Sequence, residues 1–145
     1  MKNIKKALVA ISDFESGENL IKSIINFFED WVTEIYLLTV MDSETLEHLA
    51  IFRGKTVKEV LETSKSESNN TLKNLKIAFS NTHLYITYEI KEGIVAETII
   101  ETSKIEDVDF IVVGSKRERI AKRLLKNHIR YVIELSDIPV LLFPV

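Results

Sequence analysis

The feature that most constrains the fold is an apolar run that ends at a glycine in the last third of the chain. A strand is predicted at 109–113, just before Gly114, and a basic connection, a helical pattern over about 127–136 and a second apolar run at 140–143 follow. Apolar runs without alternation are typical of strands covered on both faces, as in parallel sheets. Such sheets form ligand crevices where a buried strand stops at a glycine shortly before a helix. This stretch therefore predicts an open α/β sheet with a crevice beside Gly114.

Three further segments have the pattern of strands. Residues 7–11 and 34–40 are short apolar runs, whereas residues 84–90 alternate strictly between apolar and polar positions. Strict alternation predicts a strand with one face in the core and the other in solvent, as at the edge of a sheet. The side chains expected on its exposed face are Tyr85, Thr87 and Glu89.

Apolar residues at helical spacing connect these strands. They predict a first helix that Ser16 caps and that runs to about residue 30, a second over 55–79, and a third that follows Gly93 and ends by about residue 104. Alternating strands and helices indicate a parallel sheet with right-handed crossovers. We therefore expect one α/β domain over residues 1–145: a doubly wound, five-stranded parallel sheet with strand order 3-2-1-4-5 and helices on both faces.

Two segments leave alternatives open at this stage. Residues 64–70, in the middle of the helix predicted over 55–79, are wholly polar. They fit either one long helix with a solvated centre or two helices with a break near 68–70. Residues 41–54 fit either a short amphipathic helix or a loop that acts as a lid.

Composition excludes several classes of protein. With 145 residues, of which 46% are hydrophobic and 28% charged, the chain is expected to form one soluble domain. It contains no cysteine, which excludes disulfides and thiolate metal sites. No apolar run approaches the roughly 20 residues that cross a bilayer, and the N-terminus does not resemble a signal peptide, so we expect a cytoplasmic protein without a membrane partner. The histidines lack metal-ligand spacing and the common catalytic motifs are absent, so no metal or catalytic residue is predicted.

Positive charge is concentrated in the connection after Gly114. Residues 116–130 contain seven Lys or Arg residues and one acid, Glu118, although the whole chain has a formal net charge of −3. This asymmetry predicts a local site for a small anionic ligand and no specific nucleic-acid binding. A solvated surface segment is the alternative interpretation of the same charges.

The spacing of residues from Gly114 onward resembles the phosphate-binding motif of the universal stress protein family. That motif reads Gly, two residues, Gly, nine residues, and then Gly followed by Ser or Thr. Gly114 fits its first position. In the same frame Arg117 and Asn127 take the two later glycine positions, and His128 takes the hydroxyl position.

Other parts of the chain resemble the same family. Asp13 and Phe14 resemble its Asp-Phe pair after the first strand, and residues 34–40 and 93–97 resemble two further blocks. The resemblance implies an adenine nucleotide such as ATP in the crevice, and a homodimer formed through the C-terminal strand. Outside the motif positions already named, the residues that match its nucleotide-binding positions are Asp13, Val40, Ser115 and Ile129.

The motif departs from the family pattern at three positions. Arg117 places a long side chain where glycine lets the backbone approach a phosphate, and His128 cannot replace a serine hydroxyl, whereas Asn127 can still cap a helix. We therefore expect weak or no ATP binding, with Lys and Arg side chains as the alternative phosphate contacts. Asp13 and Val40 also have plain structural interpretations, as a helix-preceding turn residue and as the end of a strand.

These features favour a non-catalytic homodimer that acts in a stress response or binds a partner. The alternative is an ATP-binding or ATP-hydrolysing protein that uses the crevice at Asp13, Gly114 and Asn127. The dimer is also predicted from the pattern of residues 140–143, because a wholly apolar edge strand without charges is prone to pair with another chain. A second copy related by a two-fold axis would cover it.

Overall fold

The structure, a computed structural model, describes residues 5–115 and 128–145. A five-stranded, all-parallel sheet in the order β3-β2-β1-β4-β5 forms its centre, so the predicted strand order is confirmed. The strands are β1 (Lys6–Ala10), β2 (Glu34–Asp42), β3 (Tyr85–Gly93), β4 (Phe110–Ser115) and β5 (Val140–Pro144).

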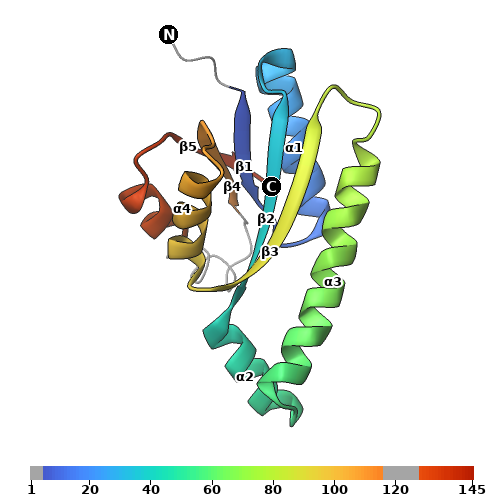
Figure 1. Ribbon diagram of the computed structural model, residues 1–145, viewed down its shortest axis with the longest axis vertical. Coiled ribbons are helices and arrows are strands. Elements are labelled where there is room, and N and C mark those ends of the chain that lie inside the picture. The colour runs from blue at the N-terminus through green and yellow to red at the C-terminus, as the bar shows by residue number, and fades with distance from the viewer. Residues whose placement is uncertain (1–4, 116–127) are drawn as a thin grey trace.

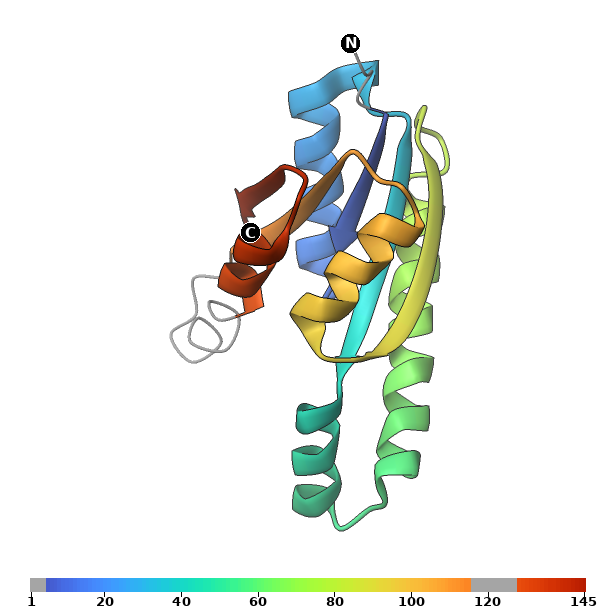
Figure 2. The same ribbon diagram turned by 60° about the vertical axis from the view of Figure 1, so that its left-hand side comes forward.

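Helices cover both faces of the sheet, which confirms the doubly wound architecture (Figures 1 and 2). One face carries α1 and α3, and the other carries α4 and a helical segment at 128–135. Of the helix predicted over 127–136, Asn127 lies outside the described residues. The other helices are α1 (Phe14–Phe28), a short 3-10 helix η1 (Glu29–Trp31), α2 (Ser43–Arg53), α3 (Val57–Ala78) and α4 (Val95–Ile105).

Alternate residues of the central strands enter two separate apolar clusters. In β1, Ala7 and Val9 pack towards α1 and α3, whereas Leu8 packs towards α4. All three side chains are fully buried. This double burial explains why β1 reads as a continuous apolar run, because neither face of a central parallel strand meets water.

The first helix begins earlier than predicted, and the prediction of Ser16 as its N-cap is wrong. Asp13 has extended backbone angles (φ −147°, ψ 170°), and its carboxylate accepts a hydrogen bond from the Ser16 backbone N–H at 2.8 Å. Asp13 is therefore the N-cap, and Ser16 lies inside the first turn. An Asp and a Ser three residues apart can both start a helix, and apolar spacing alone does not choose between them.

The two ambiguous segments form a helical hairpin that extends past the carboxyl ends of the strands (Figure 2). Residues 43–53 are α2, which ends at Gly54 in the left-handed conformation (φ 62°). Thr56 then caps α3 by accepting a hydrogen bond from the Glu59 backbone N–H at 3.1 Å. The helix is continuous over its 22 residues, so the long helix is confirmed and the break near 68–70 is wrong.

The edge strand β3 is less exposed than its alternation predicts. Tyr85 is exposed as expected, but Thr87 and Glu89 are only partly exposed. The reason is that α4 packs against this face of β2 and β3. An alternating pattern shows which face is more polar, but not whether a helix covers it.

Candidate functional site

A cavity of about 340 Å³ opens at the carboxyl ends of the strands. Its floor comes from the ends of β1, β2 and β4, and its walls come from α1, the α2–α3 hairpin, α4 and the helical segment at 128–135. The strand β1 lies between β2 on one side and β4 on the other, and the chain crosses from β3 back over the sheet to reach β4. This reversal of strand order is where open α/β sheets bind ligands, because the connecting loops diverge there.

The structure brings four of the residues matched to the family motif together in this cavity. Val40, Gly114, His128 and Ile129 all line it. Val40 and Gly114 approach from the ends of β2 and β4, and the other two from the helical segment. Arg117 and Asn127, together with most of the basic connection, lie outside the described residues.

Asp13 and Ser115 are not among the described residues that line the cavity. The Asp13 carboxylate holds the start of α1, and it also accepts a hydrogen bond from the Ser12 hydroxyl at 3.3 Å. Ser115 pairs with Pro144 at the end of the β4–β5 ladder, and its carbonyl accepts a hydrogen bond from the Val145 N–H at 3.2 Å. Both residues therefore fix the chain at the border of the crevice.

Gly114 lies close to the side chain of Val145. A β-carbon at Gly114 would lie 2.9 Å from a methyl group of Val145 and 3.6 Å from Leu20. Val145 itself lines the cavity. The absence of a side chain at Gly114 thus lets the end of the chain fold over β4 and form part of the wall.

The described lining is mainly apolar, with polar groups that are mostly hydroxyls. None of its described residues is Lys or Arg, and Asp42 is the one acidic side chain among them. The Asp42 carboxylate accepts a hydrogen bond from the Thr45 hydroxyl at 2.9 Å, and the Thr39 hydroxyl donates to the Ile11 carbonyl at 3.0 Å. Apolar walls with a few hydroxyls fit a flat organic ligand with neutral hydrogen-bonding groups.

Sequence reasoning missed the contribution of α3 to this cavity. Ser64 and Ser68 belong to the polar centre that was predicted to be solvated, yet both are partly buried and line the cavity. The signal was present in their spacing. They lie four and eight residues after Val60, on the face of the helix that is buried at both of its ends.

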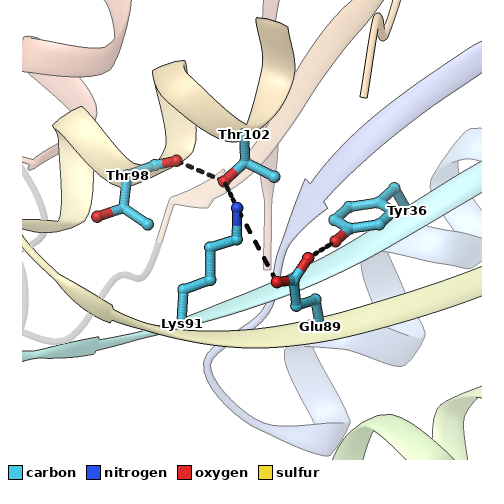
Figure 3. A network of polar contacts seen from close by, with 5 residues as sticks. All are labelled: Tyr36, Glu89, Lys91, Thr98 and Thr102. Carbon is cyan, nitrogen blue, oxygen red and sulfur yellow. Dashed lines mark hydrogen bonds and ion pairs between the residues drawn. The ribbon is translucent and has the colours of Figure 1, made fainter. Parts of the chain in front are cut away.

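A polar network ties α4 to the edge of the sheet (Figure 3). The Tyr36 hydroxyl donates to Glu89, and the Lys91 ammonium group contacts both Glu89 (4.0 Å) and the Thr102 hydroxyl (3.0 Å). The Thr102 hydroxyl in turn donates to the Thr98 carbonyl at 2.7 Å. Burial, and then the hydrogen bond to Glu89, raise the pKa of the Tyr36 phenol far above its usual value of 10.0. The network holds α4, which also forms part of the cavity wall.

Within 5–115 and 128–145, no group of three or more His, Cys, Asp or Glu side chains is placed to hold a metal ion. Among the helices of that same part of the chain, none is both long and apolar enough to cross a bilayer.

Solved structures with the same fold cover nearly the whole chain. The hypothetical protein MJ0577 has a TM-score of 0.79 and 23% identity, with 99% of this chain and 98% of that protein covered. The universal stress protein UspA from Lactobacillus plantarum has a TM-score of 0.78 and 17% identity, with 98% and 99% covered. A family protein from Arabidopsis thaliana, solved with AMP bound, has a TM-score of 0.66 and 18% identity, with 97% and 91% covered.

Other similar structures are universal stress proteins in complex with dAMP and with cAMP. No curated protein matches the chain. The sequence profile of the universal stress protein family matches residues 3–144, which is almost the entire length. This protein therefore belongs to the universal stress protein family.

Proposed function

We propose that this protein is a non-catalytic nucleotide-binding module that binds an adenine nucleotide with a short phosphate chain, such as AMP, more tightly than ATP. The observation that carries the proposal is the cavity of about 340 Å³ at the reversal of strand order. This volume is near the lower end of the roughly 300–1,000 Å³ range of small-molecule sites. Family proteins of the same fold solved with AMP, dAMP or cAMP support the ligand class.

The preference for a short phosphate chain follows from the residues around the phosphate-binding positions. A triphosphate needs several backbone N–H groups at close range, which glycines allow and larger residues obstruct. Here Arg117, Asn127 and His128 stand at the small positions of the family motif. A monophosphate needs fewer of these backbone contacts than a triphosphate. The three replacements should therefore cost AMP less binding free energy than they cost ATP.

Calorimetric titration with AMP, and with ATP in the presence and absence of magnesium, tests the proposal. We expect AMP to bind with the smaller dissociation constant, and incubation with ATP and magnesium to release no phosphate. Replacing the three residues together (Arg117→Gly, Asn127→Gly and His128→Ser) should tighten ATP binding. A dissociation constant of about 1 μM or lower for ATP and the wild-type protein, about −8 kcal/mol, would contradict the proposal.

We further propose that the protein acts as a homodimer joined through β5. This edge strand is short and apolar, and Leu142 is 49% exposed. Beside it, Phe27, which is 70% exposed, packs on Phe143 of the same strand at a ring-centroid distance of 6.2 Å. Pairing with the same strand of a second copy would satisfy the open backbone edge and cover these side chains.

Light scattering of wild type and two variants tests the dimer. Wild type should have twice the chain mass of 16.7 kDa, and Leu142→Lys should give monomer or aggregate, because a buried lysine would meet its own symmetry copy. Ile51→Lys, at an exposed position on α2, is the matched control and should remain dimeric. A wild-type monomer at micromolar concentration would rule out the dimer.

A further inference from the structure

The buried face of α3 changes character where it passes the cavity. Val60, Leu72 and Leu75 on this face are almost fully buried. Between Val60 and Leu72, the two positions at successive spacings of four are Ser64 and Ser68. Residues four apart share a helix face, so the two serines interrupt an otherwise apolar face at the cavity.

Both serine hydroxyls are available to a ligand. Other hydroxyls on helices of this protein donate to the carbonyl four residues earlier, as Ser23 does at 2.8 Å and Thr63 at 3.1 Å. Ser64 and Ser68 make no such bond, and neither hydroxyl has a hydrogen-bond partner among the described residues. Larger apolar residues at the two positions would fill space and bury more apolar surface. The serines therefore bury less apolar surface than larger residues would, but they leave space in the cavity and present hydroxyl groups to it.

The strands that α3 packs against indicate which end of a bound nucleotide would contact Ser64 and Ser68. Gly114 lies at the end of β4, and phosphates bind where a strand stops at a glycine before a helix. The hairpin that carries Ser64 and Ser68 packs against β2 and β3, across β1 from that position. A nucleotide whose phosphate lies near Gly114 and which extends across β1 would direct its base towards α3.

We propose that Ser64 and Ser68 hydrogen-bond the edge of the nucleobase and determine base specificity in this cavity. A hydroxyl can both donate and accept, so two of them match an adenine edge, which presents an amine beside a ring nitrogen. This inference rests on the proposed nucleotide binding and names the residues that select the base. The apolar side chains of Val40 and Ile99, which also line the cavity, fit the flat faces of the ring.

Titrations with AMP, IMP and dAMP separate base recognition from sugar recognition. IMP lacks the exocyclic amine of AMP, and dAMP lacks the 2′-hydroxyl. Wild type should prefer AMP to IMP. Each of Ser64→Ala and Ser68→Ala should weaken AMP binding by about threefold to tenfold, the range for one lost hydrogen bond. The double variant should bind AMP and IMP with similar affinity.

Ser66→Ala is the matched control, because Ser66 lies between Ser64 and Ser68 in the sequence but on the exposed face of the same helix. It should bind AMP as wild type does. The melting temperature of the double alanine variant should equal or exceed that of wild type, since alanine favours the helix and neither hydroxyl bonds to another described residue.

Two results would overturn the inference while leaving nucleotide binding intact. The first is a double alanine variant that binds AMP as tightly as wild type does. The second is a variant that keeps its preference for AMP over IMP but loses discrimination against dAMP, which would assign the serines to the sugar. A wild-type protein that binds none of the three nucleotides would instead refute the proposed function and this inference with it.

Discussion

The two faces of the sheet differ in the interactions that hold their helices: one has apolar packing, and the other adds a network of hydrogen bonds and an ion pair. On the face of α1 and α3, strand and helix side chains form one continuous apolar cluster. On the face of α4 the apolar cluster formed by the described residues is smaller, and beside it lies the polar network of Tyr36, Glu89, Lys91 and Thr102. Apolar packing is non-directional, whereas the network depends on the placement of each donor and acceptor.

This difference separates what holds the domain together from what positions its parts. The apolar face is expected to supply more of the folding free energy, because fully buried aliphatic side chains each contribute about 1.5–3 kcal/mol. Net contributions of single hydrogen bonds are smaller, at about 0.5–1.5 kcal/mol. The network instead fixes α4 against β3, beside the cavity wall that α4 provides.

Truncation of Leu75 is the largest expected effect and tests the apolar face. The side chain is fully buried between α3 and α1, where a β-carbon at Gly17 would lie 2.7 Å from its Cδ1 atom. Leu75→Ala should therefore leave a cavity and lower the free energy of unfolding by about 2–5 kcal/mol. Urea denaturation followed by circular dichroism measures the change.

Ile77→Ala is the matched control for this truncation. Ile77 lies on the same helix but is 58% exposed, so its loss should change stability by only about 0.5 kcal/mol. If the two variants were equally stable, the α1–α3 face would not be the main source of stability, and the contrast between the faces would fail.

The apolar face was largely predictable from sequence, and the polar face was not. Periodicity identified the strands and the helical pattern of α3, because burial of one face of a strand or helix imposes a repeat in its own sequence. The strand order was expected from the alternation of strands and helices, which is typical of a doubly wound sheet. The network joins Tyr36 of β2 to Glu89 of β3 and Thr102 of α4. No local pattern connects residues this far apart, and Glu89 reads as solvent-facing until α4 is seen to pack beside it.

The position of the cavity was predictable from sequence, but its lining was predictable only in part. A glycine after a buried strand located the crevice, and Val40, Gly114, His128 and Ile129 do line it. Ser64 and Ser68 were missed because a polar helix segment is usually solvated, and only the α2–α3 hairpin brings them over the cavity. Asp13 shows the opposite case: its capping role is local, and the turn interpretation from sequence agrees with its hydrogen bond to Ser16.

Removal of the Tyr36 hydroxyl should change stability less than truncation of Leu75 does. It tests the polar face through the pH dependence of the free energy of unfolding. At neutral pH, Tyr36→Phe should cost about 1 kcal/mol, because Glu89 loses one hydrogen bond but keeps access to Lys91 and water. The folded-state pKa of Tyr36 is raised above its unfolded value of 10.0, so its contribution is complete below about pH 10. Above that pH the unfolded chain loses the proton first, and the contribution declines as pH rises towards the folded-state pKa.

The stability difference between wild type and Tyr36→Phe should therefore shrink above about pH 10. Urea denaturation at a series of values from roughly pH 8 to 11 measures it, and taking the difference removes the common effect of the other titrating groups. Tyr85→Phe, which removes an exposed tyrosine hydroxyl from the neighbouring edge strand β3, shows what the substitution does without the network. A difference for Tyr36→Phe that stayed constant across this range would mean that the Tyr36 phenol and Glu89 do not share a proton-dependent contact.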